Sequence, residues 1–147
     1  MPVSPSKSKI CFFFQDTSPA LKNRSELKKF IGSIFKKEGK ELESLNYIFC
    51  TDKALLEINR QYMGHDYYTD IITFELSKKG GPVQGEIYIS IDRVRENAQT
   101  HQQSFKSEIH RVIFHGTLHL CGYADKTPKD SKKMRSKEDS YLLSYFE

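Results

Sequence analysis

Short apolar runs alternate with segments of helical character along the chain, and together they predict a mixed α and β fold. Apolar runs of strand length occur at residues 10–15, 45–50, 71–76 and 85–91. Spaced apolar residues, in three cases behind the potential N-caps Ser25, Asp52 and Asp92, predict helices at residues 25–39, 52–58, 92–98, 105–121 and 129–145. The expected fold class is therefore α+β, with a mixed sheet of about four strands packed against helices.

Length and composition limit the class of protein. The chain has 147 residues, 37% of them hydrophobic, which suits one domain over residues 1–147, and we expect residues 1–8 to be flexible. No apolar stretch reaches the roughly 18 residues that a membrane helix needs, and no secretion signal is recognisable. The three cysteines are far apart and lack a C-x-x-C pair, so we predict reduced core thiols and a cytoplasmic protein without a membrane partner.

The charge distribution permits an anionic partner without requiring one. The formal net charge is +4 at pH 7, which is only modestly basic. Basic residues crowd just after the helix predicted at residues 105–121, and they comprise Lys126, Lys129, Lys132, Lys133, Arg135 and Lys137. Either an anion-binding surface or a solvated helix face would give this pattern.

Two histidines lie within the segment 105–121, whose apolar residues on nearly every side indicate a central, buried helix. His115 and His119 are one turn apart and project from the same helix face. Gly122 is suited to end the helix, and the turn that follows lets Asp125 complete a set of two histidines and one carboxylate. Catalytic zinc sites use such sets and leave a fourth position open to water. Single buried histidines are usually hydrogen-bonded core residues, but a pair at this spacing favours a metal site.

The glycine between the histidines argues against one common hydrolase. Zinc proteases of the H-E-x-x-H type carry a glutamate beside the first histidine, whereas this chain has Gly116 there. Gly116 would permit either the close approach of a substrate or backbone or simply close packing. Glu108, on the same side two turns earlier, is expected to be solvated or to pair with Arg111.

At this point the sequence resembles a known family. The stretch HGTLHLCGYAD, residues 115–125, is similar to the signature H-G-x-L-H-L-x-G-Y-D-H of the YbeY family of metal-dependent bacterial endoribonucleases. Residues 58–74, INRQYMGHDYYTDIITF, are similar to the family pattern LN-x-x-Y-R-G-x-D-x-x-T-D/N-V-L-S-F, and residues 85–87 are similar to its G-D-I. The order and spacing fit from about residue 10 onward.

Two positions depart from the family pattern. The resemblance implies His115, His119 and Asp125 as ligands of one divalent metal ion, with Asp125 in place of the family's third histidine. We expect zinc, although an oxygen donor lowers the selectivity against manganese or iron. Met63 stands where the family has an arginine, and methionine cannot hold a phosphate. Arg60, one turn earlier if the segment is helical, could substitute for it.

The resemblance implies hydrolysis of single-stranded RNA by a metal-activated water. It further implies maturation of the 3′ end of small-subunit ribosomal RNA and ribosome quality control, with ribosomal RNA and the small ribosomal subunit as partners and no role for DNA. We expect substrate contacts from Thr69, Asp70, Arg111, Lys126 and Lys129, and base stacking from Tyr67, Tyr68 or Tyr123. Three alternatives stay open: a ribosome-assembly factor with a mainly structural metal, a zinc metalloprotease-like hydrolase and a non-haem iron oxygenase.

Overall fold

The computed structural model describes residues 9–19 and 21–147, so the flexibility expected for residues 1–8 lies outside the described residues. Within that part of the chain, four strands form one sheet, and they are β1 (Ile10–Phe14), β2 (Leu42–Cys50), β3 (Ile71–Glu75) and β4 (Val83–Ser90). The strand order is β1-β2-β4-β3, in which β3 runs antiparallel to β4 and the other neighbours are parallel. The predicted mixed sheet and α+β class are confirmed.

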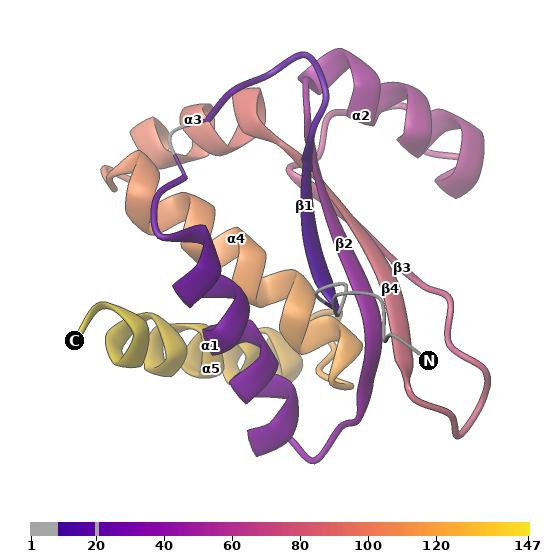
Figure 1. The fold of residues 1–147 in the computed structure, drawn as a ribbon. Helices are drawn as coiled ribbons and strands as arrows, with labels where there is room; N and C mark the ends of the chain where they lie inside the picture. Colours follow the sequence, from indigo (N-terminus) through magenta and orange to yellow (C-terminus); the bar gives the residue numbers. More distant parts are fainter. Residues whose placement is uncertain (1–8, 20) are drawn as a thin grey trace, which may run out of the picture.

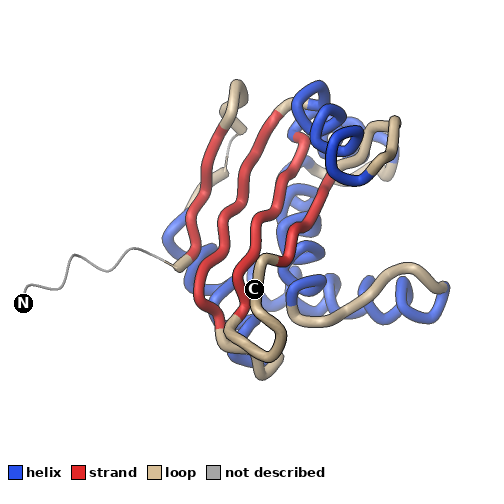
Figure 2. Tube along the Cα trace, turned by 90° about the vertical axis from the view of Figure 1, so that its right-hand side faces the viewer, coloured by secondary structure: helices blue, strands red, loops and turns tan. Residues whose placement is uncertain are grey.

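The helices cover the sheet unequally. They are α1 (Arg24–Lys37), α2 (Asp52–Ile58), α3 (Ile91–Thr100), α4 (Phe105–Leu120) and α5 (Pro128–Phe146), and a π-helical turn, η1 (Asn59–Met63), extends α2. Figure 1 shows α1, α4 and α5 on one side of the sheet and α2 on the other. In Figure 2 the strands lie in front of most of the helices. The main core therefore lies between the sheet and α4.

The predicted helix starts were displaced by one or two residues. Thr51 and Ser90 cap α2 and α3, because their side-chain oxygens accept hydrogen bonds from the backbone N–H groups of Ala54 and Arg93. Asp52 and Asp92 therefore occupy the first turns rather than the cap positions, and Ser25 lies inside α1. Hydroxyl and carboxylate caps serve equally well, so the sequence alone did not distinguish adjacent candidates.

Helix α4 is the centre of the packing, as its apolar composition predicted. Its buried residues are Glu108, Ile109, His110, Val112, Ile113, Phe114, Gly116, Thr117, Leu118 and Leu120. The one buried hydroxyl among them is satisfied: Thr117 Oγ1 donates to the carbonyl of Ile113 at 2.8 Å and accepts from the Tyr47 hydroxyl at 2.5 Å. This bond ties α4 to β2 in the middle of the core.

Two glycines set the distance between α4 and the sheet. A Cβ on Gly116 would lie 2.9 Å from the Cδ1 atoms of both Ile71 and Ile87, and a Cβ on Gly85 would lie 2.7 Å from Leu120 Cδ1. Such separations are too short for carbon atoms in van der Waals contact. Gly116 was expected to permit either the close approach of a substrate or close packing. The structure shows close packing of Gly116 against side chains of β3 and β4.

Two cysteines are structural. Cys50 and Cys121 are buried free thiols, and burial raises the pKa of each to about 12. Because the thiolate is the reactive form, neither is suited to nucleophilic chemistry near neutral pH. No helix in the described part of the chain combines the length and apolarity needed to cross a bilayer.

The packing of Gly116 can be tested against Gly32, a second helical glycine with no atom within 4 Å of its virtual Cβ. Alanine favours the helix over glycine by about 1 kcal/mol, so Gly32→Ala should stabilise the protein. Gly116→Ala should be less stable than Gly32→Ala by about 1–2 kcal/mol, because overpacking against Ile71 and Ile87 opposes the gain. Urea unfolding measures both, and equal stabilisation would contradict the close contact.

Candidate metal centre

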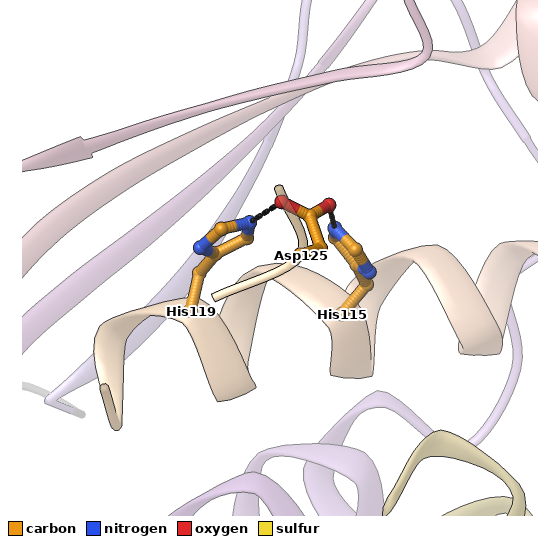
Figure 3. A group of neighbouring side chains, drawn as sticks. All are labelled: His115, His119 and Asp125. Atoms are coloured by element: carbon orange, nitrogen blue, oxygen red, sulfur yellow. Dashed lines mark ion pairs between the residues drawn. The ribbon is translucent and has the colours of Figure 1, made fainter. Parts of the chain in front are cut away.

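The structure brings His115, His119 and Asp125 together at the end of α4 (Figure 3). His115 Nε2 lies 3.2 Å from Asp125 Oδ2, and His119 Nε2 lies 3.3 Å from Asp125 Oδ1. One potential ligand atom from each residue lies within 4.8 Å of the other two. Three donors at these separations can converge on one cation, as the sequence spacing predicted.

The loop after α4 places the carboxylate. Gly122 adopts φ 103°, which other residues rarely adopt, and the N–H of Tyr123 then bonds the carbonyl of Leu118 at 3.0 Å. The carbonyl of Asp125 accepts a hydrogen bond from Ser131 Oγ at 2.8 Å, which fastens the loop to α5. The chain therefore turns back over the helix end and holds Asp125 above the histidines.

A carboxylate on α5 orients the first histidine, and sequence reasoning missed it. His115 Nδ1 lies 2.6 Å from Glu138 Oε2, so the ring donates there and turns Nε2 toward Asp125. Glu138 is buried, and its other oxygen accepts from Arg111 at 2.9 Å. Metal-binding histidines commonly donate their second nitrogen to a carboxylate in this way. The sequence feature that could have indicated this role is the position of Glu138 on the apolar face of a predicted helix, one turn from both Met134 and Leu142.

The two imidazoles differ electrostatically. Burial disfavours the charged form of His115, but the hydrogen bond to Glu138 and the charges of Glu138 and Asp125 outweigh it and raise its pKa above 6.5. Burial and then the neighbouring His115 lower the pKa of His119. His119 therefore presents a neutral nitrogen near pH 7, which is the form that binds metals.

The donor set fits a divalent transition metal. Two imidazole nitrogens and one carboxylate oxygen are typical of zinc sites that keep an open coordination position. The hydrogen bond that His115 donates to Glu138 supplies the outer support that such sites require. The three side chains are partly exposed, at 21%, 34% and 37%, toward a cleft of about 770 Å³. A substrate could therefore reach the fourth side of the centre.

The cleft is lined by more acids than bases. It contains five carboxylates and two guanidinium groups, and they are Asp70, Glu75, Glu108, Asp125, Glu138, Arg111 and Arg135. Without a bound cation, this balance opposes the entry of a phosphate group. Asp125 and Glu138 already belong to the candidate metal centre, and the three further carboxylates add to the reasons for placing a cation there.

The predicted substrate residues lie at different distances from this cleft. Thr69, Asp70 and Arg111 line it. Lys126 is exposed next to Asp125 but does not line the cleft, and the exposed Arg60 forms ion pairs with Glu57 and Asp66 outside it. The expected replacement of the family arginine by Arg60 therefore has no support in the geometry, whereas Met63 does line the cleft.

The three tyrosines expected to stack on bases also differ in their position relative to the cleft. Tyr67 lines the cleft and is 56% exposed, and its ring stacks on His65 with centroids 5.1 Å apart. Tyr68 lies against the guanidinium of Arg93. The hydroxyl of Tyr123 donates to Glu38, which leaves it in a structural contact. Tyr67 is the one of the three that is placed to meet a substrate in the cleft.

Glu108 differs from what the sequence indicated. It is only 8% exposed, and Arg111 forms ion pairs with Glu138 and Asp139 instead of with Glu108. Burial raises its pKa, and the negative charge of nearby Asp70 raises it further. The cause of the error is tertiary: α5 supplies stronger partners for Arg111 than the helix neighbour does.

The half-buried Asp70 shares this environment. Burial raises its pKa, although His115 and a hydrogen bond from Asn97 act in the opposite direction. Asn97 Nδ2 lies 3.5 Å from Asp70 Oδ2, at the limit of a hydrogen bond. The cleft therefore contains two carboxylates, Asp70 and Glu108, that do not belong to the candidate ligand set of His115, His119 and Asp125.

The fold and the cleft define an α+β protein with a candidate metal centre on its central helix, and comparison with known proteins assigns it further. Residues 14–145 match the family described as Endoribonuclease YbeY. The chain belongs to the YbeY family of endoribonucleases, which confirms the resemblance drawn from the sequence.

Relatives and a solved structure agree with this assignment. The Endoribonuclease YbeY of Cytophaga hutchinsonii is 51% identical over 133 residues, which cover 90% of this chain and 93% of that protein. The protein of the same name from Parabacteroides distasonis is 42% identical over 134 residues, with the same coverage. A solution structure from Thermotoga maritima has a TM-score of 0.66 at 32% identity, covering 92% of this chain and 89% of that one.

The orienting role of Glu138 can be measured as metal affinity. Glu138→Gln removes the carboxylate that holds His115, and zinc affinity should fall by about 10- to 100-fold. Asp139→Asn is the matched control, because Asp139 also binds Arg111 but is 58% exposed and does not contact a histidine. Competition with a chromogenic chelator gives both affinities. Wild-type affinity in Glu138→Gln would contradict the role.

The buried charge of Glu108 should appear in the pH dependence of stability. Because the pKa of Glu108 is raised in the folded state, the folded protein holds that proton more tightly, and stability falls as pH rises above about 4.5. Glu108→Gln should therefore exceed wild type by about 1 kcal/mol at pH 7, with the gap closing toward pH 4.

Urea unfolding at both pH values checks this expectation. Asp70, His101, Arg111 and Arg135 act on Glu108 and remain in both proteins, so the two proteins differ only in the carboxyl group of residue 108. Glu43→Gln, at an exposed position on β2, should match wild type within about 0.5 kcal/mol at both pH values. Parallel pH profiles for wild type and Glu108→Gln would contradict the burial argument.

Proposed function

We propose that the protein is a zinc-dependent endoribonuclease that hydrolyses phosphodiester bonds in single-stranded RNA. Membership in the YbeY family supports RNA cleavage, and the observation that carries the proposal is the convergence of His115, His119 and Asp125 at a cleft. The physiological substrate in this proposal is the 3′ region of small-subunit ribosomal RNA in the cytoplasm. Maturation and quality control of the small ribosomal subunit would then be its role.

The ion would activate a water molecule and polarise a phosphoryl oxygen when it is bound. Two residues of the chain hold the ligand side chains in the state that binds the ion. Glu138 fixes the ring of His115, and His119 keeps an unprotonated nitrogen near neutral pH. Five carboxylates against two guanidinium groups make the cleft dependent on a cation before a phosphodiester can enter. This dependence favours a catalytic centre over a mainly structural one.

Substrate contacts can be assigned from the lining of the cleft. Arg111 has five N–H donors and uses two of them on Glu138 and Asp139, so others remain for a phosphate. Arg135 lines the same cleft, Thr69 lies at its wall, and Lys126 stands outside it next to the ligand Asp125. We assign these four residues to the RNA backbone, in place of the arginine that the family pattern has where this chain has Met63.

Specificity for single strands is supported by Tyr67. Its exposed ring lines the cleft and is held by a 2.8 Å hydrogen bond between its hydroxyl and His65 Nδ1. The buried Asn59 donates to the carbonyl of Tyr67 at 2.9 Å and anchors this loop to η1. An aromatic ring held at a cleft wall can stack on an unpaired base, which a duplex does not offer.

The proposal is tested by ligand variants assayed for both cleavage and stability. His119→Ala and Asp125→Ala should each lower cleavage of a labelled single-stranded RNA by at least about a hundredfold, because the ion is lost or misplaced. Their melting temperatures without metal should stay near that of the metal-free wild type. Arg60→Ala, which alters a cation outside the cleft, should cleave within about twofold of wild type.

Other outcomes would redirect the assignment. Loss of stability in step with loss of metal, and no RNA cleavage by the wild type, would favour a structural metal in an assembly factor. Cleavage of a casein substrate without cleavage of RNA would favour a metalloprotease-like hydrolase. Full cleavage by Asp125→Ala would remove Asp125 from the centre.

A further inference from the structure

We infer that the acidic end of the cleft, formed by Asp70 and Glu108, is a nucleoside subsite that accepts a hydrogen bond from a hydroxyl or amino group of the substrate. The inference rests on the proposed function, because it names what the same cleft recognises beyond the scissile phosphate. Asn97 of α3 and His101, the residue that follows α3, line the cleft as well. The chemistry of the acidic end differs from that of the metal centre.

The side chain of Glu108 carries the inference. It is 8% exposed and lines the cleft, yet its carboxylate makes no hydrogen bond or ion pair with any described residue. Among the described residues, only Arg93 Nε is a fully enclosed side-chain polar atom without a hydrogen-bond partner, so the oxygens of Glu108 are open to the cleft and not enclosed in the core. Buried acids in proteins are normally paired or hydrogen-bonded, whereas His101, Arg111 and Arg135 act on Glu108 only through their charges. Arg111, three residues further along α4, is close enough to pair with it but bonds α5 instead. The hydrogen-bonding capacity of Glu108 is therefore left for a ligand in the cleft.

The position of Glu108 excludes a direct part in bond cleavage. It lies seven residues before His115, which is about 10 Å along the helix axis and about 20° around it. Proton transfer to the reacting atoms needs a separation of about 3 Å. The carboxylate thus faces the same cleft as the metal ligands but is displaced along it, where a neighbouring nucleotide of a bound strand would lie.

The charge of this end selects the kind of group that it can bind. Carboxylates only accept hydrogen bonds, and two of them repel a phosphate. Arg111 and Arg135, whose charges also act on Glu108, attract the phosphates together with the cation, so the carboxylates are left to receive a neutral, donor-bearing part of the substrate. In RNA such donors are the ribose 2′-hydroxyl and the amino groups of adenine, guanine and cytosine.

A purely structural role for Asp70 and Glu108 predicts different contacts and a different effect on stability. If Glu108 only stabilised the fold, it would have a partner, and its removal would lower stability. The Asp70 carboxylate accepts from its own backbone N–H and has a contact with Asn97 at the limit of a hydrogen bond, which leaves part of its acceptor capacity unused as well. Two under-satisfied carboxylates at one end of a substrate cleft therefore indicate recognition.

The test couples Glu108 to individual groups of the RNA. One set of oligonucleotides carries a single 2′-deoxy substitution at each position around the mapped cleavage site, and a second set lacks one base amino group at each position. The kcat/KM of each is measured with wild type, Glu108→Leu and Glu108→Gln. Glu43→Gln, which alters an exposed acid on β2 away from the cleft, is the control.

We expect one substitution to lower kcat/KM of wild type and of Glu43→Gln by about tenfold, the loss typical of a hydrogen bond to a charged group. The same substitution should have no effect in Glu108→Leu and a smaller effect in Glu108→Gln, whose amide oxygen still accepts. An effect in the deoxy set assigns the ribose, and one in the other set assigns the base. A 2′-hydroxyl that acts in the chemistry itself would lower cleavage equally in all variants and would show no coupling.

Equal sensitivity of wild type and Glu108→Leu at every position would overturn the subsite. The proposed function fails separately: if wild type leaves the RNA intact, the same comparison is made with dissociation constants from fluorescence anisotropy, because the RNA is then uncut. Coupling in those constants would support the subsite without the nuclease activity, and its absence would overturn both.

Discussion

The rotation of α4 about its axis decides where both histidines lie, and two glycine contacts fix that rotation. Gly116 lets Ile71 and Ile87 reach the helix surface, and Gly85 makes room for Leu120 one turn later. Since residues 116 and 120 face the sheet, residues 115 and 119 lie about 100° around the helix, toward the cleft beside β3. A helix pushed away from the sheet would carry the imidazoles out of reach of the loop that holds Asp125.

Helix α5 completes the centre without supplying a ligand. Met134, Tyr141 and Leu142 bury this helix against the core, and Glu138 projects from the same side to His115. A buried carboxylate costs free energy unless it is paired, and Glu138 is paired twice, with His115 and Arg111. Arg111, His115 and Glu138 therefore join α4 to α5, and the same contacts orient His115 as a potential metal ligand. The geometry of the site thus depends on the docking of α5.

The balance of charge in the cleft explains how the two departures from the family signature fit together. Aspartate at position 125 adds a negative charge where the signature has a histidine, and methionine at position 63 removes a positive one. Both changes make the cleft more acidic and increase its need for a divalent cation. Arg111 and Arg135, from α4 and α5, supply the guanidinium groups that remain. Recognition of neutral nucleoside groups at the acidic end is consistent with the same balance.

Local information in the sequence determined the elements and the ligand candidates. Among the described residues, apolar periodicity located the four strands and five α-helices to within a few residues but not η1, and a spacing of four placed His115 and His119 on one face, because both depend only on backbone geometry. The tertiary structure alone decided which charges meet. Arg111 and His115 of α4 both contact Glu138 of α5, so these contacts exist only when the two helices dock. The same docking leaves Glu108 buried without an ion pair to Arg111. Arg60 does not line the cleft for the same reason, since the direction of η1 relative to the cleft is set by packing and not by local sequence.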